Sequence, residues 1–156
     1  MKEVSSSSPN PSQPFVAAEF EWLCQRYRFD VRSRSASLLD DFLERFSGNK
    51  SRSFVDLGTG FGANFLYLAA QLECPQTWYL VDRDEGLTQR VDWLVAHAHY
   101  FLDEQAAETL RKRLQNGSIS YRAINLEFTA LRQLPTETVD AFVANAVFDL
   151  NTPAQY

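Results

Sequence analysis

A glycine-rich loop that follows an acidic residue is the segment of this sequence best suited to bind a ligand. Residues 54–69 read FVDLGTGFGANFLYLA, so Asp56 stands two positions before the GxGxG run that begins at Gly58. Glycine permits positive φ angles and lets the backbone approach a ligand closely, and the helix expected after the loop begins with free N–H groups. We therefore predict that this loop holds a ligand.

The acids around the loop indicate the kind of ligand. Dinucleotide-binding enzymes carry a GxGxxG loop, whereas the spacing here is GxGxG. A carboxylate at Asp56 would repel a pyrophosphate and suit an ammonium or sulfonium group. Asp82 ends the run TWYLVD one strand–helix–strand unit later, where a carboxylate can accept hydrogen bonds from both hydroxyls of a ribose. Asp84 is the alternative residue for this ribose contact.

These residues resemble the motifs of the class I S-adenosylmethionine-dependent methyltransferases. The first motif of that family is an acid, any residue and Gly-x-Gly-x-Gly, which Asp56 and the glycines after it match position for position. The second is an acid that closes the second strand, which Asp82 matches. The third is a polar residue that meets the adenine, and here Asn125 stands where many relatives have Asp. The fourth lines the methyl-transfer site, with Asn145 and Asp149 as its polar members.

The resemblance implies S-adenosylmethionine as the cofactor and methyl transfer to an unidentified small-molecule acceptor as the reaction. It assigns no catalytic residue, because such an enzyme mainly positions the acceptor and excludes water. No NPPY-like motif follows the fourth strand, which argues against methylation of the amino groups of adenine or glutamine. The sequence looks like an uncharacterised bacterial branch of the family. The implied cofactor-binding residues are Asp56, Gly58, Thr59, Gly60, Gly62, Asp82, Arg83, Asn125, Leu126 and Asn145.

The elements that must position these residues follow from the hydrophobic periods along the chain. A Ser/Pro-rich stretch over 1–14 predicts a disordered tail, 15–50 predicts N-terminal helices, and 51–156 predicts the cofactor-binding half of a methyltransferase core. The alternation of strands and helices is typical of an α/β fold, an open parallel Rossmann-like sheet with helices on both faces and an N-terminal helical lid. Strands are expected over 53–57, 77–81, 119–124 and 139–144, and helices over 15–28, 36–47, 63–72, 86–115 (with a break near Asp103) and 127–133.

The family fold has seven strands, and only four are predicted here. We therefore expect a chain truncated after the fourth strand, with its C-terminal strands missing. The predicted fourth strand, Val139–Ala144, is apolar on both faces and would form a bare sheet edge. Self-association through this edge is the expected consequence.

Composition limits the remaining functions. The net charge of −5 makes a nucleic-acid partner unlikely, although Arg26, Arg28, Arg32 and Arg34 form a basic cluster near the end of the first helix. That cluster is either a solvated helix end or a lid that approaches an anionic group. No apolar run is long enough to span a membrane, the two cysteines are far apart, and His97 and His99 are not spaced as metal ligands, so a cytoplasmic protein without a metal is expected. A non-catalytic cofactor-binding module and a nicotinamide-dependent oxidoreductase remain as alternatives.

Overall fold

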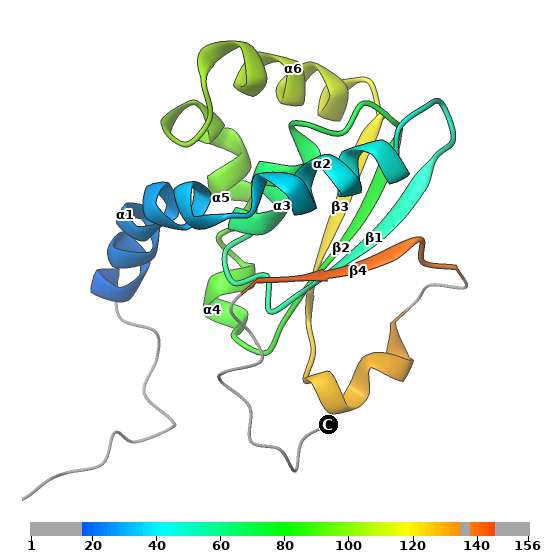
Figure 1. Ribbon diagram of the computed structural model, residues 1–156. Coiled ribbons are helices and arrows are strands. Elements are labelled where there is room, and N and C mark those ends of the chain that lie inside the picture. The colour runs from blue at the N-terminus through cyan, green and yellow to red at the C-terminus, as the bar shows by residue number, and fades with distance from the viewer. Residues whose placement is uncertain (1–16, 135–137, 146–156) are drawn as a thin grey trace, which may run out of the picture.

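The computed structural model describes residues 17–134 and 138–145, and it confirms the predicted alternation of strands and helices (Figure 1). Within these residues, none of the helices is both long and apolar enough to cross a membrane. The predicted tail over 1–14 and Asp149 lie outside the described residues. The elements are α1 (Ala17–Ser33), α2 (Ala36–Arg45), β1 (Arg52–Leu57), α3 (Ala63–Ala69), β2 (Gln76–Asp82), α4 (Glu85–Thr88), α5 (Val91–Ala96), η1 (Ala98–Tyr100), α6 (Glu104–Gln115), β3 (Ile119–Asn125), η2 (Phe128–Gln133) and β4 (Ala141–Ala144).

The sheet has four parallel strands in the order β3-β2-β1-β4. The chain moves outward from β1 through β2 to β3 and then crosses to the far side of β1. Because crossovers between parallel strands are right-handed, this reversal requires the last crossover to use the opposite face. Figure 1 shows α2, α3 and α6 above the sheet and the orange 3-10 helix η2 below it. The predicted α/β fold with helices on both faces is therefore confirmed, and the point of reversal lies between β1 and β4.

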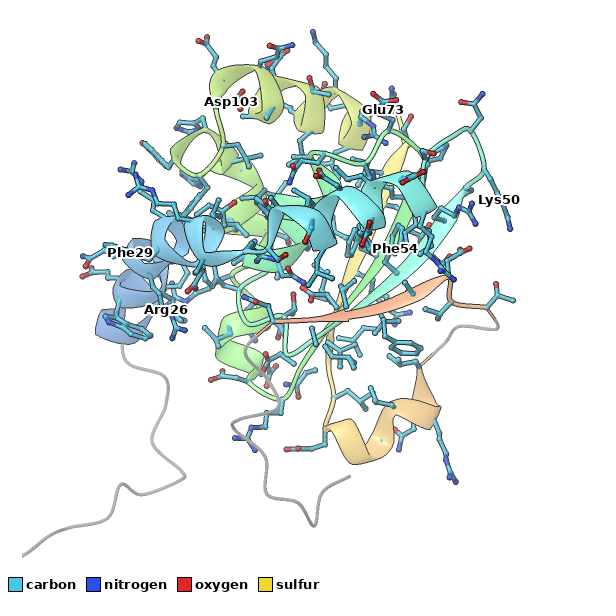
Figure 2. The ribbon with its side chains drawn as sticks, in the orientation of Figure 1. Arg26, Phe29, Lys50, Phe54, Glu73 and Asp103 are labelled. Carbon is cyan, nitrogen blue, oxygen red and sulfur yellow. The ribbon has the colours of Figure 1, made fainter. Side chains whose placement is uncertain are left out.

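Aromatic side chains fill the space between the sheet and the helices above it. Phe54 of β1 and Trp78 of β2 are neighbours in register, fully buried, and have ring centroids 4.7 Å apart. Phe46, next to α2, meets Phe54 edge to face at 5.2 Å, and Phe65 of α3 packs on Trp78 at 5.5 Å. Figure 2 shows Phe54 beneath α2. This core fixes α2 and α3 on one face of the two strands that lead into the glycine loop.

The stretch predicted as one helix over 86–115 is divided into shorter pieces. The expected break near Asp103 is confirmed, because the Asp103 carboxylate caps α6 by accepting from the Ala106 amide at 2.8 Å. Two further breaks separate α4, α5 and η1. Packing against the glycine loop explains these breaks. Leu87 of α4 lies next to the place that a Cβ at Gly60 would occupy, and Val91 of α5 lies next to the place that a Cβ at Gly62 would occupy. One straight helix would not follow the loop in this way.

β4 is an outer strand of the sheet formed by the described residues. Its Phe142 side chain is 58% exposed, which is unusual for a large apolar residue in a strand. An outer strand also presents unpaired backbone groups that can pair with another chain. Self-association through this strand stays a prediction.

Candidate functional site

The glycine loop leaves β1 in a conformation that few other residues could adopt. Gly58, Gly60 and Gly62 have φ angles of +63°, +58° and +96°. A side chain at Gly62 would also bring its Cβ within 3.3 Å of Leu94 Cδ2. The Thr59 amide donates to the carbonyl of Val81 on β2 at 3.0 Å, which holds the loop against the next strand. The glycine spacing therefore serves backbone geometry and close packing at once.

Asp56 lies beneath this loop and is completely buried. Its two carboxylate oxygens accept hydrogen bonds from Thr59 Oγ1 at 2.7 Å and from Asn64 Nδ2 at 2.8 Å. Burial raises the pKa of Asp56 to about 6, although the hydrogen bonds from Asn64 and Thr59 and the charge of Arg34 oppose the shift. Asp56 thus organises the loop from inside. Its predicted contact with the charged end of a ligand stays a prediction.

Arg34 and Asn64 extend this network to the surface. Arg34 lies between α1 and α2, and its Nη1 donates to Asn64 Oδ1 at 2.6 Å. Its guanidinium also lies over the ring of Tyr67, 4.5 Å from the centroid. A continuous path of side chains therefore runs from Arg34 through Asn64 to the Asp56 carboxylate.

In the sequence alone, Arg34 is not distinguished from the three other arginines of the basic cluster. Those three, Arg26, Arg28 and Arg32, are exposed, and Figure 2 shows Arg26 on the outer side of α1. Arg26 forms an ion pair with Asp30, one helical turn later on the same face. Of the four arginines, Arg34 alone follows the end of α1, in the turn before α2. This position between two predicted helices is the sequence signal that could have identified it.

Asp82 joins the glycine loop to the loop after β2. Its Oδ2 accepts from the Gly60 amide at 2.8 Å and its Oδ1 accepts from the Asp84 amide at 2.9 Å, while the residue stays partly exposed. Each oxygen retains a further lone pair for a ligand hydroxyl. Asp84 has a different task, because its side chain accepts from the Leu87 amide at 3.1 Å and caps α4. The geometry therefore favours Asp82 over Asp84 as a ligand residue.

The other predicted residues lie at the carboxyl ends of the strands. Asn125, at the end of β3, is exposed and donates through Nδ2 to the carbonyl of Arg83 at 2.9 Å. The Leu126 amide donates to the carbonyl of Asp82 at 2.9 Å. These contacts fasten the ends of β2 and β3 together, and the Arg83 side chain is exposed beside them.

Asn145 lies apart from the contacts between β2 and β3. It follows Ala144, which pairs with Leu57 immediately before Gly58, so the ends of β1 and β4 lie side by side. There it lines a groove of about 470 Å³ between the α1–α2 junction, α3 and β4, together with Arg34 and Tyr67. We call this space the β4 groove. The structure thus places the predicted residues along one edge of the sheet, divided between the β1–β2–β3 ends and the β4 groove.

This arrangement suits a ligand that carries hydroxyls and a positive group. In an open α/β sheet, ligands bind outside the carboxyl ends of the strands at the point where the strand order reverses. The glycine loop lies at that point, with the Asp82 carboxylate beside it and the charge of Asp56 beneath it. Negative charge at both positions disfavours a pyrophosphate. The residues present therefore fit a nucleoside whose ribose reaches Asp82.

Comparisons with known proteins support the fold. No family model and no curated protein matches the sequence. Among solved structures, the chain is similar to a candidate S-adenosyl-L-methionine-dependent methyltransferase from Methanococcus maripaludis, with a TM-score of 0.59 and 14% sequence identity. The match covers 94% of this chain and 57% of that protein, so the chain spans little more than half of its length. At this identity the likeness concerns architecture, and the chain has the Rossmann-like α/β fold of that methyltransferase.

Proposed function

We propose that this chain binds S-adenosylmethionine and takes part in methyl transfer to a small-molecule acceptor. The observation that carries the proposal is the hydrogen bond from the Gly60 amide to Asp82, which joins the glycine loop and the acid predicted to bind the ribose into one unit. This unit lies at the carboxyl edge of a sheet whose fold is that of a candidate methyltransferase. The match to the acid-x-Gly-x-Gly-x-Gly motif adds independent support from the sequence.

Each residue of the site would have a distinct part in binding. Asp82 would accept from the ribose hydroxyls, as charge-assisted hydrogen bonds, and Asn125 would meet an edge of the adenine. The positive φ angles at Gly58 and Gly60 would let the backbone approach the amino-acid end of the cofactor. Asp56 would act through the loop that it organises and through its negative charge, because its oxygens already hold Thr59 and Asn64.

Methyl transfer from this cofactor requires mainly that the protein position the acceptor. The bound cofactor supplies a methyl group on a sulfonium, which leaves as a neutral thioether. The chain would hold the acceptor in line with that group and keep water away, and orientation of this kind lowers a barrier by several kcal/mol, about 7 or more in favourable cases. Asn145, beside the end of β1, lies where an acceptor would contact the protein.

Titration calorimetry tests the cofactor directly. We expect the full chain to bind S-adenosylhomocysteine, the demethylated product, and to show no heat with NAD. Binding of NAD without binding of S-adenosylhomocysteine would overturn the proposal in favour of a nicotinamide enzyme. A methyl-transfer assay with radiolabelled cofactor and a panel of small acids, phenols and amines would then test the reaction.

A further inference from the structure

The β4 groove combines a positive charge with an apolar wall, and the cofactor-binding residues at the ends of β2 and β3 do not line it. Its apolar wall includes Leu38, Leu39 and Phe42 of α2, Leu68 near the end of α3 and Val143 of β4. Leu38 is 70% exposed, so a side chain of this kind is available to a ligand. A volume of about 470 Å³ suits a small organic molecule.

Arg34 brings an incompletely satisfied cation to this wall. Its Nη1 donates to the neutral Asn64 side chain and its guanidinium stacks on Tyr67. Its Nε is buried and has no hydrogen-bond partner. Among the described residues, the ion pairs involve Arg26, Arg52, Arg111 and Lys112 but not Arg34. Arg34 therefore has no carboxylate partner of its own among the described residues, and an anion in the groove would contact the part of the guanidinium that lines it.

The start of α2 adds a second favourable element. This helix has ten residues, and Ser33, Arg34 and Ser35, which precede it, all line the groove. The N-terminal end of a helix carries partial positive charge from its unpaired N–H groups. The start of α2 therefore adds to the charge of Arg34 at this end of the groove, whereas the buried Asp56 carboxylate opposes it. Asn64, Asn145 and the apolar side chains of α2 and β4 form the rest of the lining.

We propose that the β4 groove binds a carboxylate with an apolar body, held by Arg34, and that this molecule is the methyl acceptor. Binding of the carboxylate follows from the groove alone, whereas the acceptor role rests on the proposed function. Because Leu57 pairs with Ala144, the groove adjoins the start of the glycine loop, and Asn64 connects Arg34 to the loop. A molecule anchored at Arg34 would thus extend toward the site of methyl transfer.

The first test uses defined probes. Benzoate, 4-phenylbutyrate and octanoate would be titrated into the full chain by calorimetry, each beside its neutral amide of the same shape. We expect at least one carboxylate to bind, and to bind about tenfold or more tightly than its amide, since an ionised acceptor makes the stronger, charge-assisted contact with a guanidinium. Failure of all three carboxylates to bind, or equal affinity of acid and amide, would overturn the proposal.

Matched variants locate the contact. Arg34→Met should abolish the preference for the carboxylate, whereas Arg32→Met, at an exposed neighbour, should leave it unchanged. Since Arg34 also supports Asn64, a second pair avoids buried contacts: Leu38→Glu should weaken carboxylate binding and Leu38→Lys should preserve or strengthen it. If both Leu38 variants bind the carboxylate equally, or if Arg34→Met still prefers the carboxylate to its amide, the carboxylate does not bind in the β4 groove.

A third comparison separates an acceptor from the carboxylate of the cofactor itself. Because Arg34 supports the glycine loop through Asn64, Arg34→Met should change the affinities for S-adenosylhomocysteine and for 5′-methylthioadenosine, which lacks the carboxylate, by the same factor. If it instead weakens S-adenosylhomocysteine much more than 5′-methylthioadenosine, Arg34 holds the carboxylate of the cofactor and the acceptor proposal is overturned. If the original chain binds the carboxylates but not S-adenosylhomocysteine, the proposed function fails while the carboxylate groove stands.

Discussion

Asp56 and Asp82 lie near the carboxyl ends of two neighbouring strands, β1 and β2, but their environments differ. Asp56, in β1, is completely buried and accepts from two side chains, Thr59 and Asn64. Asp82, at the end of β2, is partly exposed and accepts from two backbone amides, those of Gly60 and Asp84. Both contact the glycine loop, one from the inside and one from the edge.

The comparison shows how two carboxylates near one loop divide their tasks. A buried acid whose oxygens are bound by side chains stabilises the fold around the loop, and its charge is costly unless those bonds are present. An acid held by backbone amides at the surface is fixed in direction and still has lone pairs for a ligand. We therefore expect changes at Asp56 to act mainly on stability and changes at Asp82 mainly on binding.

The largest expected effect is that of Asp56→Ala on the free energy of unfolding. The change leaves the Asn64 amide buried without its acceptor, removes the acceptor of Thr59 and creates a void, for a combined loss of about 3 kcal/mol. Urea denaturation followed by circular dichroism measures it. A loss below about 1 kcal/mol would mean that the buried carboxylate does not organise the loop.

The pH dependence of stability should identify the same carboxyl group. Its folded-state pKa of about 6 lies above the ordinary value of 3.8, so the protonated form is the one that folding favours. The contribution of Asp56 is fully present below about pH 4 and is lost as pH rises to about 6, by an amount on the order of 2–3 kcal/mol. The difference in unfolding free energy between the original chain and Asp56→Asn should therefore decline over that range and then level off. A difference that is constant from pH 4 to 7 would contradict the raised pKa.

Asp82→Ala should act on the ligand. Loss of the charge-assisted bonds to the ribose should weaken S-adenosylhomocysteine binding by about 2 kcal/mol, while the lost contacts to Gly60 and Asp84 lower stability by about 1 kcal/mol. Asp84→Ala is the matched control. It removes the cap of α4, also at about 1 kcal/mol of stability, but should leave affinity unchanged. The reverse pattern of affinities in calorimetry would assign the ribose to Asp84.

The smallest expected effect is that of Thr59→Val on the Asp56 carboxylate. Thr59→Val preserves shape and removes one donor to Asp56, which should cost about 1 kcal/mol of stability and raise the pKa of Asp56 further. Thr88→Val is a control of similar burial, because its hydroxyl donates only within its own helix to Glu85. The pH-dependent step in stability should move upward in Thr59→Val and stay in place in Thr88→Val.

Local patterns were enough to predict most of the architecture. Short apolar and β-rich runs predicted the four strands, and the spacing of acids and glycines placed Asp82 and Gly60 in one site, where the structure joins them by a hydrogen bond. Asp103 was recognisable as a break because its residue type favours a helix cap. These features depend on residues close together in the chain or on a known order of elements.

Features that depend on packing between distant segments could not be predicted. The tight binding of both Asp56 oxygens requires Asn64 to face inward, which helical periodicity alone does not specify. The role of Arg34 requires the turn between α1 and α2 to meet α3, thirty residues further on. The breaks within 86–103 follow from the shape of the glycine loop against which α4 and α5 pack.

The pairing of β1 with β4 has a consequence for the order in which the protein folds. Ser53 and Asp140, which meet where these strands begin, are 87 residues apart, whereas β1 and β2 are joined by a short crossover through α3. Closing the longer loop costs about 1 kcal/mol more entropy, and long-range pairing of this kind slows folding. The β1–β2–β3 unit, with Asp82 against the glycine loop, can therefore assemble first. The groove beside Arg34 exists only after β4 has docked, so the site at the glycine loop takes shape before the groove next to it.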